Sequence, residues 1–228
     1  MERDYIERAL AKAEAAVANQ EGLHGTGFWK AVAGARRDRR LAAEYADRMA
    51  GIDRRAFEQG VRLRVPAALG TAILAAGTGA GVVAIVVCDD IDSPLWKSTV
   101  FLAGFGALEL STHSLAHWVV GRLMGMRFTY YFLGGPPPPR PGAKLDYATY
   151  LRVPPRKRAA MHASGAVVTK LIPFALIPVA RAYDLPVSVV GLLAVVGAGQ
   201  IVTDVLLSTK SSDWKKVKRE LRAARSWA

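Results

Sequence analysis

The sequence has little cysteine and no long apolar stretch near its start, and each absence excludes a class of structure. Cys88 is the single cysteine among 228 residues, which excludes a disulfide within the chain and a cysteine-rich metal centre. The first 60 residues are polar and lack the apolar centre of a signal peptide, so we expect no such peptide there.

Charged residues are almost absent from four long apolar segments. Because a helix needs about 20 apolar residues to cross a bilayer, each segment is long enough to span one. Each of the last three segments contains one charged residue, namely Glu109, Lys170 and Asp204. The sequence therefore predicts an all-α integral membrane protein with four transmembrane helices, at about Val65–Val87, Thr99–Gly121, Ala159–Ala180 and Pro186–Ser208.

Lysine and arginine are concentrated in alternate connections between these segments. Residues 1–64, 122–158 and 209–228 contain 13, 8 and 7 of them, whereas residues 88–98 and 181–185 contain one each. Since positive residues beside a span favour the cytosol, this alternation predicts an even number of spans in a cell membrane, with both termini cytoplasmic.

The formal net charge of +12 would suit nucleic acid or anionic lipid. The basic residues stand beside the apolar segments, so we interpret them as topology signals and contacts to anionic lipid, and expect no nucleic acid. Four of them are expected to face lipid: Arg152, Arg156, Lys157 and Arg158. Residues 1–62 have helical periodicity over Asp4–Asn19 and Trp29–Ala50, which predicts a cytosolic helical extension before the membrane domain of residues 63–228.

Three ionisable residues share one face of the second apolar segment. Glu109, His113 and His117 are spaced four apart, so they form a stripe on a helix. Two histidines at this spacing can direct ring nitrogens at one metal ion. Ionisable groups inside a bilayer are costly and usually mark function.

The carboxylate of Asp204 is expected at the same depth in the membrane as the two histidines. The second and fourth segments are predicted to run in the same direction, which places Asp204 at nearly the depth of His117. His162, near the cytosolic start of the third segment, lies at a similar or shallower level. Two histidines and one carboxylate leave a fourth position open, which is typical of a catalytic zinc site. The alternatives are hydrogen bonds between helices and a proton or ion path. His162 could bind the metal or a substrate, or could be a structural or interfacial residue. Lys170 could also contact a substrate or support the site, but a lysine at such a place is more often a packing or snorkelling residue.

These residues resemble those of the site-2 protease family of intramembrane zinc metalloproteases, over roughly Thr99–Glu220. Members carry His-Glu-x-x-His on one helix and an aspartate from a later helix. The resemblance implies that His113, His117 and Asp204 bind Zn²⁺. Two further stretches contribute to it: Pro155–Gly165, which leads into the family's middle helix, and the tail Ser208–Trp214.

The sequence departs from the family at three places. Ser114 stands where the family has the glutamate that acts as general base, and a serine hydroxyl has no useful basicity near neutral pH. Val202 and Thr203 replace an Asn-Pro pair before Asp204, and Ala166 replaces the proline of a Gly-Pro pair. Glu109 shares the histidine face one turn away and could act as the base, as a further ligand, or to orient an imidazole.

The loop between the second and third segments predicts a short β-strand, because Arg127–Phe132 is rich in β-formers. The four prolines that follow predict a stiff polyproline II segment. By resemblance, such a strand would pair with unwound substrate; its aromatic residues would serve equally well as interfacial anchors.

Two functions remain in competition. The first is a site-2-protease-like hydrolysis of peptide bonds in a membrane-embedded protein substrate, with an atypical base. The second is a non-proteolytic metal-binding protein that binds membrane partners. A membrane di-iron desaturase needs many more than the four histidines present, and a transporter has no support from an internal repeat.

Overall fold

The structure is a computed structural model of the chain and describes residues 2–134, 140–206 and 212–227. It is mostly helical and falls into two compact units. The first unit contains residues 1–70, 121–159 and 219–228, and the second contains residues 71–120 and 160–218.

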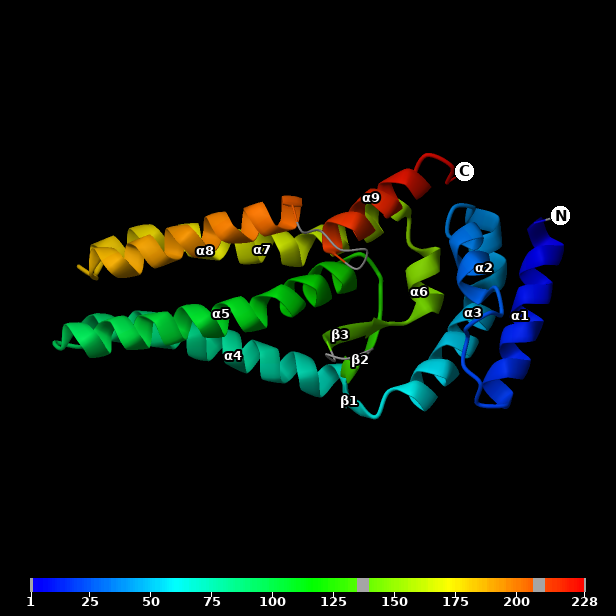
Figure 1. The fold of residues 1–228 in the computed structure, drawn as a ribbon, viewed down its shortest axis with the longest axis horizontal. Helices are drawn as coiled ribbons and strands as arrows, with labels where there is room; N and C mark the ends of the chain where they lie inside the picture. The colour runs from blue at the N-terminus through cyan, green and yellow to red at the C-terminus, as the bar shows by residue number, and fades with distance from the viewer. Residues whose placement is uncertain (1, 135–139, 207–211, 228) are drawn as a thin grey trace. The chain divides into compact units, whose positions relative to one another are not determined.

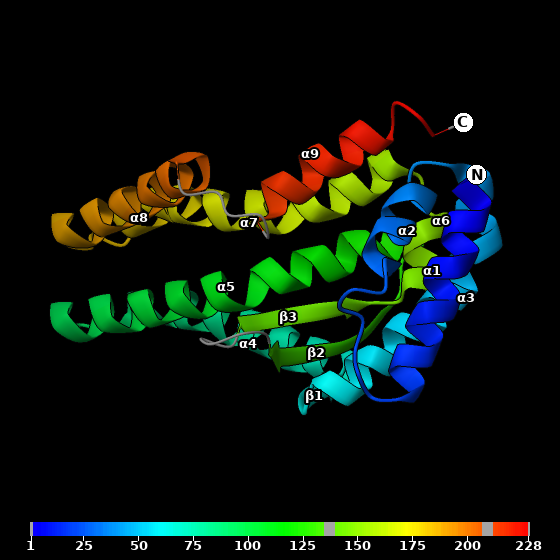
Figure 2. The ribbon, with the colours of Figure 1, turned by 45° about the vertical axis from the view of Figure 1, so that its right-hand side comes forward.

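The second unit is built on four long helices, and α9 (Asp213–Ala223) begins in it. Figure 1 and Figure 2 both draw α4 beside α5 and α7 beside α8. Aliphatic and aromatic side chains from all four helices share one core, in which Phe101, Ala180 and Leu193 are fully buried. The helix bounds are α4 (Ala67–Val87), α5 (Pro94–Leu123), α7 (Pro155–Ala182) and α8 (Val187–Leu206).

Three helical segments among the described residues are long and apolar enough to cross a membrane: Ala67–Asp90, Pro155–Ala182 and Val187–Asp204. They overlap three of the four predicted spans. Helix α5 has the length, but Glu109 and the two histidines within it reduce its mean hydropathy. The span on α5 therefore stays a prediction, and so does the orientation of the termini.

Two glycines bring α5 against α4 within the same core. A Cβ atom on Gly104 would lie 2.8 Å from the carbonyl oxygen of Gly81, and one on Gly81 would lie 2.9 Å from that of Gly104. Such close approach of backbones through small residues is typical of helices that pack in membranes.

The first unit combines helices α1 (Glu2–Ala18), α2 (Phe28–Ala35) and α3 (Arg39–Gly60) with a small sheet and helix α6 (Tyr147–Arg152). The predicted helices at the N-terminus are confirmed, but the second one is divided. Asp38 divides it, because its side chain accepts hydrogen bonds from the backbone N–H groups of Arg40 and Leu41 and so begins α3.

The sheet is antiparallel, with the order β1-β2-β3. Its strands are β1 (Leu63–Pro66), β2 (Phe128–Gly134) and β3 (Arg140–Leu145). The predicted strand in the loop is confirmed as β2, while β1 and β3 were not predicted. The predicted polyproline II segment, residues 136–139, lies outside the described residues, and so does part of the tail that carries the family resemblance, residues 208–211.

Several charged side chains are buried in the first unit, where they form ion pairs. Arg158 and Glu220 are both fully buried, with Nε of Arg158 2.9 Å from Oε2 of Glu220. The hydroxyl of Tyr150 donates to Oε1 of Glu220 at 2.9 Å. Arg158 was expected to face lipid, and this expectation is wrong because Glu220 and Tyr150 draw its side chain into the protein. Arg152 instead forms an exposed ion pair with Asp47.

Candidate metal centre

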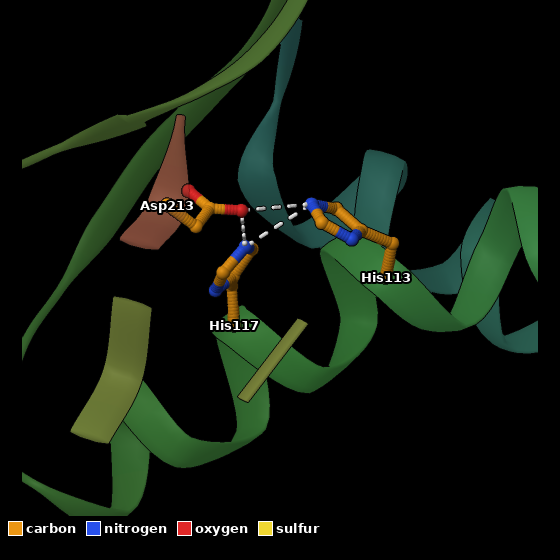
Figure 3. A group of neighbouring side chains, drawn as sticks. All are labelled: His113, His117 and Asp213. Carbon is orange, nitrogen blue, oxygen red and sulfur yellow. Dashed lines mark hydrogen bonds and ion pairs between the residues drawn. The ribbon is translucent and has the colours of Figure 1, made fainter. Parts of the chain in front are cut away.

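Helix α5 places two imidazoles side by side. His113 and His117 lie one turn apart, and their Nε2 atoms are 3.2 Å from each other. Their rings are nearly perpendicular, with centroids 4.7 Å apart. The predicted stripe therefore points two ring nitrogens at one place, as Figure 3 shows.

Asp213, the first residue of α9, completes the group. Its Oδ2 atom lies 3.2 Å from Nε2 of His117 and 3.3 Å from Nε2 of His113. Among the described residues, these three side chains are the histidine, cysteine or acidic residues that come close enough together to hold a metal ion.

The hydrogen bond of His117 Nδ1 determines whether Nε2, the nitrogen that faces Asp213, carries a proton or a lone pair. Nδ1 of His117 lies 2.7 Å from the carbonyl oxygen of Met161. A carbonyl only accepts, so Nδ1 carries the proton and the Nε2 atom of neutral His117 carries a lone pair. Two acceptor atoms, Nε2 of His117 and Oδ2 of Asp213, then face each other at 3.2 Å. A positive charge between them, either a proton on Nε2 or a metal ion, would resolve this arrangement.

The three distances fit a small divalent ion. A triangle with edges of 3.2 to 3.3 Å is one face of a tetrahedron whose centre lies about 2.0 Å from each corner. This is the Zn–N and Zn–O distance in proteins, and two imidazoles with one carboxylate are a zinc-type donor set. A bond from the Nδ1–H of a ligand histidine to a backbone carbonyl is also usual in such sites.

Helix α7 leaves room for the His117 ring because residue 165 is a glycine. A Cβ atom on Gly165 would lie 2.4 Å from Nε2 of His117 and 2.8 Å from the carbonyl oxygen of His113. One turn of α7 thus contributes both the Met161 carbonyl that orients the ring and the space that the ring occupies.

Asp213 is well prepared to be an anionic ligand. Burial alone would raise its pKa, but hydrogen bonds from His113 and His117 when their Nε2 atoms are protonated, together with the Lys216 ammonium 2.8 Å from Oδ1, hold the pKa well below its usual range. The carboxylate is therefore ionised at neutral pH.

Asp204, the third ligand in the sequence prediction, is engaged elsewhere. Its Oδ2 atom accepts a hydrogen bond from the indole Nε1–H of Trp214 at 2.9 Å and forms an ion pair with Lys170. The structure brings Asp213, not Asp204, to the two histidines. The prediction considered acidic residues inside the apolar segments alone, and Asp213 follows the last of them.

The remaining predicted site residues lie on α5 and α7. Glu109 lies on α5 one turn before His113, and its Oε2 accepts a hydrogen bond from Nε2 of Gln200 at 2.7 Å. Ser114 is partly exposed on α5. His162, the residue after Met161 on α7, is buried. Lys170 forms the ion pair with Asp204 and also donates to the carbonyl oxygen of Ala166 at 3.1 Å.

The chain was compared with known protein families, curated proteins and solved structures. No protein-family model, curated protein or solved structure matches the chain.

Proposed function

We propose that this chain is a metal-dependent hydrolase of site-2 protease type, which cleaves peptide bonds of membrane-embedded polypeptides. The observation that carries the proposal is the convergence of His113, His117 and Asp213 within 3.3 Å. They lie in a bundle that contains helices apolar enough to cross a membrane. We further propose that α5 is the fourth span and that both termini are cytoplasmic.

The three side chains would hold a zinc ion through two nitrogens and one oxygen. When bound, zinc supplies Lewis acidity, since it polarises a carbonyl oxygen and lowers the pKa of water to about 7. Asp213 contributes negative charge to the site, and the Met161 carbonyl keeps the His117 ring in one tautomer.

Glu109 is the proton acceptor in this proposal. It shares the histidine face of α5, about 6 Å along the axis from His113. Its Oε1 atom is buried and has no hydrogen-bond partner among the described residues, while Gln200 holds Oε2. One oxygen of the carboxylate is thus fixed and the other is available for a proton. Ser114 cannot take this role because a hydroxyl is too weak a base.

A second function, metal binding without proteolysis, is favoured by a different observation. The position directly after His113 carries a serine, and the nearest carboxylate on the same face is bonded to Gln200. In this alternative the ion stabilises the fold and the protein binds membrane partners.

Proteolysis is tested with purified protein in lipid vesicles that also contain a reporter with one transmembrane segment between two tags. We expect the wild type to cleave the reporter with zinc and to stop when a chelator is added. His113→Ala, Asp213→Ala and Glu109→Gln should each reduce the rate at least about 100-fold, as expected for a lost ligand or base. Ser114→Ala is the matched control and should retain activity.

The outcomes separate the two functions. Full activity of His113→Ala would rule out a metal-dependent hydrolase at this site. Stoichiometric zinc without cleavage of any reporter, and cleavage gained on Ser114→Glu, would favour the non-proteolytic alternative.

A further inference from the structure

The third ligand of the metal centre is attached differently from the other two. His113 and His117 stand on the same helix, α5, which fixes their spacing. Asp213 instead stands at the first residue of α9, beyond the end of α8. The position of its carboxylate therefore depends on how the first turn of α9 is held.

Trp214, the neighbour of Asp213, ties that turn to α8. Its indole Nε1–H donates to Oδ2 of Asp204 at 2.9 Å. Because successive residues of a helix differ by about 100°, Trp214 points to a different side of α9 from Asp213 and leaves the carboxylate free to face the histidines.

Lys170 on α7 completes the attachment. It forms an ion pair with the same Asp204 oxygen and lies 5.9 Å from the centroid of the Trp214 ring. The side chains of Lys170 and Asp204 are 17% and 34% exposed, so the pair is partly shielded from water. Polar groups from α7, α8 and α9 thus meet directly beside Asp213.

We propose that Trp214, Asp204 and Lys170 are positioning residues, which dock α9 and so deliver Asp213 to the metal. Asp204 then acts through Trp214 and is not a ligand. Metal binding and the docking of α9 are consequently linked, and each strengthens the other by the same factor. The proposal rests on the metal centre but not on peptide hydrolysis.

Zinc affinity, measured by competition with a chromogenic chelator, tests the proposal. Trp214→Phe and Asp204→Ala should each weaken binding about tenfold, as expected for one lost hydrogen bond to a charged acceptor. The double variant should be no weaker than Asp204→Ala alone, because Asp204→Ala already removes the contact that Trp214→Phe removes. Asp204→Asn keeps an oxygen that can accept from the indole and should therefore stay within about threefold of wild type.

Two comparisons keep positioning apart from ligation. Asp213→Ala should lose at least about 100-fold in affinity and change the absorption spectrum of bound Co²⁺, whereas Co²⁺-saturated Trp214→Phe should give the wild-type spectrum. Trp96→Phe, an exposed tryptophan at the start of α5, is the matched control and should bind as wild type. If Asp204→Asn loses as much affinity as Asp213→Ala was expected to lose, or Trp214→Phe binds as wild type, the proposal is wrong.

The linkage has a second readout, the rate at which trypsin cuts α9. Lys215 and Lys218 are exposed on this helix and offer cleavage sites. Zinc should slow cleavage there in the wild type, have no effect in His113→Ala, and protect Trp214→Phe less. Cleavage that is equally fast with and without zinc in the wild type would overturn the linkage. Neither readout uses peptidase activity, so this inference and the proposed function can fail separately.

Discussion

The Nδ1 atom of His117 on α5 lies 2.7 Å from the carbonyl oxygen of Met161 on α7. This contact fixes the tautomer of neutral His117, so that the lone pair of Nε2 points toward Asp213. A backbone acceptor keeps this orientation whatever side chain stands at position 161. The packing of α7 on α5, more than any side chain of α7, therefore prepares the metal centre.

The purified protein should bind one zinc ion per chain. His113→Ala and Asp213→Ala should each weaken binding at least about 100-fold, because each removes one of three ligands. Metal analysis after dialysis, together with a chelator competition, measures both effects. Ser114→Ala is the control on the same helix and should retain the metal. Equal zinc content in wild type and His113→Ala would contradict the assignment.

Gly165→Ala should weaken metal binding although it removes no ligand. The added Cβ atom would lie 2.4 Å from Nε2 of His117, so either the ring or α7 must move. Overpacking of this kind costs about 1–3 kcal/mol, which is about 5- to 150-fold in affinity if the ring moves. A zinc titration of the variant measures the effect.

The control for Gly165→Ala is Gly191→Ala on α8. A Cβ atom at Gly191 would meet nothing within 4 Å, so this variant has the same helix-favouring substitution without the clash. Wild-type zinc affinity is expected for Gly191→Ala. If both variants bind zinc equally well, the approach of α7 to His117 is not the one described.

Gly104→Ala should destabilise the four-helix bundle. Its Cβ atom would lie 2.8 Å from the Gly81 carbonyl oxygen and 2.9 Å from a side-chain carbon of Ile85, so α4 and α5 must separate. We expect a loss of about 1–3 kcal/mol in the free energy of unfolding, measured by thermal unfolding in detergent. Gly106→Ala, two residues further on the same helix, meets nothing within 4 Å and should not lower the midpoint.

The histidine pair was predictable, and the aspartate was not, for a physical reason. Residues four apart on a helix share a face whatever the rest of the chain does, so His113 and His117 could be paired from their spacing. Asp213 joins them only through the docking of α9. A search for acidic residues at the right depth in the spans found Asp204, because depth follows from the helix rise while the path of the tail does not.

The same distinction applies to the fold. Long apolar segments and the β-formers of β2 carry their own signal, and the structure agrees with three of the four predicted spans and with the predicted strand. Strand β1 has only four residues and comes directly before α4, and β3 begins with Arg-Pro-Gly. Both become strands only because β2 offers them a partner, a non-local effect that single-segment reasoning misses.

The four-span topology predicts which positions face the outside of the cell. In a Cys88→Ala background, Asp92→Cys should react with a membrane-impermeant maleimide in intact cells. Lys157→Cys, which replaces an exposed residue at the start of α7, should react only after the membrane is permeabilised. Labelling of both Asp92→Cys and Lys157→Cys in intact cells would show that α5 does not cross the membrane, because positions 92 and 157 would then lie on the same side.

Arg158→Met should destabilise the first unit far more than a neighbouring arginine variant. Arg158 and Glu220 are fully buried and 2.9 Å apart. Removing the guanidinium leaves a buried carboxylate that keeps the hydrogen bond from Tyr150 and only longer contacts to Arg36 and Arg219, at 3.5 and 3.4 Å. Breaking such a pair costs about 3–5 kcal/mol, measured by thermal unfolding, whereas exposed Arg156→Met should cost almost nothing. Glu220→Gln added to Arg158→Met should recover part of the loss, because the buried charge is gone while an oxygen still accepts from Tyr150. Equal melting of Arg158→Met and Arg156→Met would mean that the burial of charge at Glu220 does not hold this unit together.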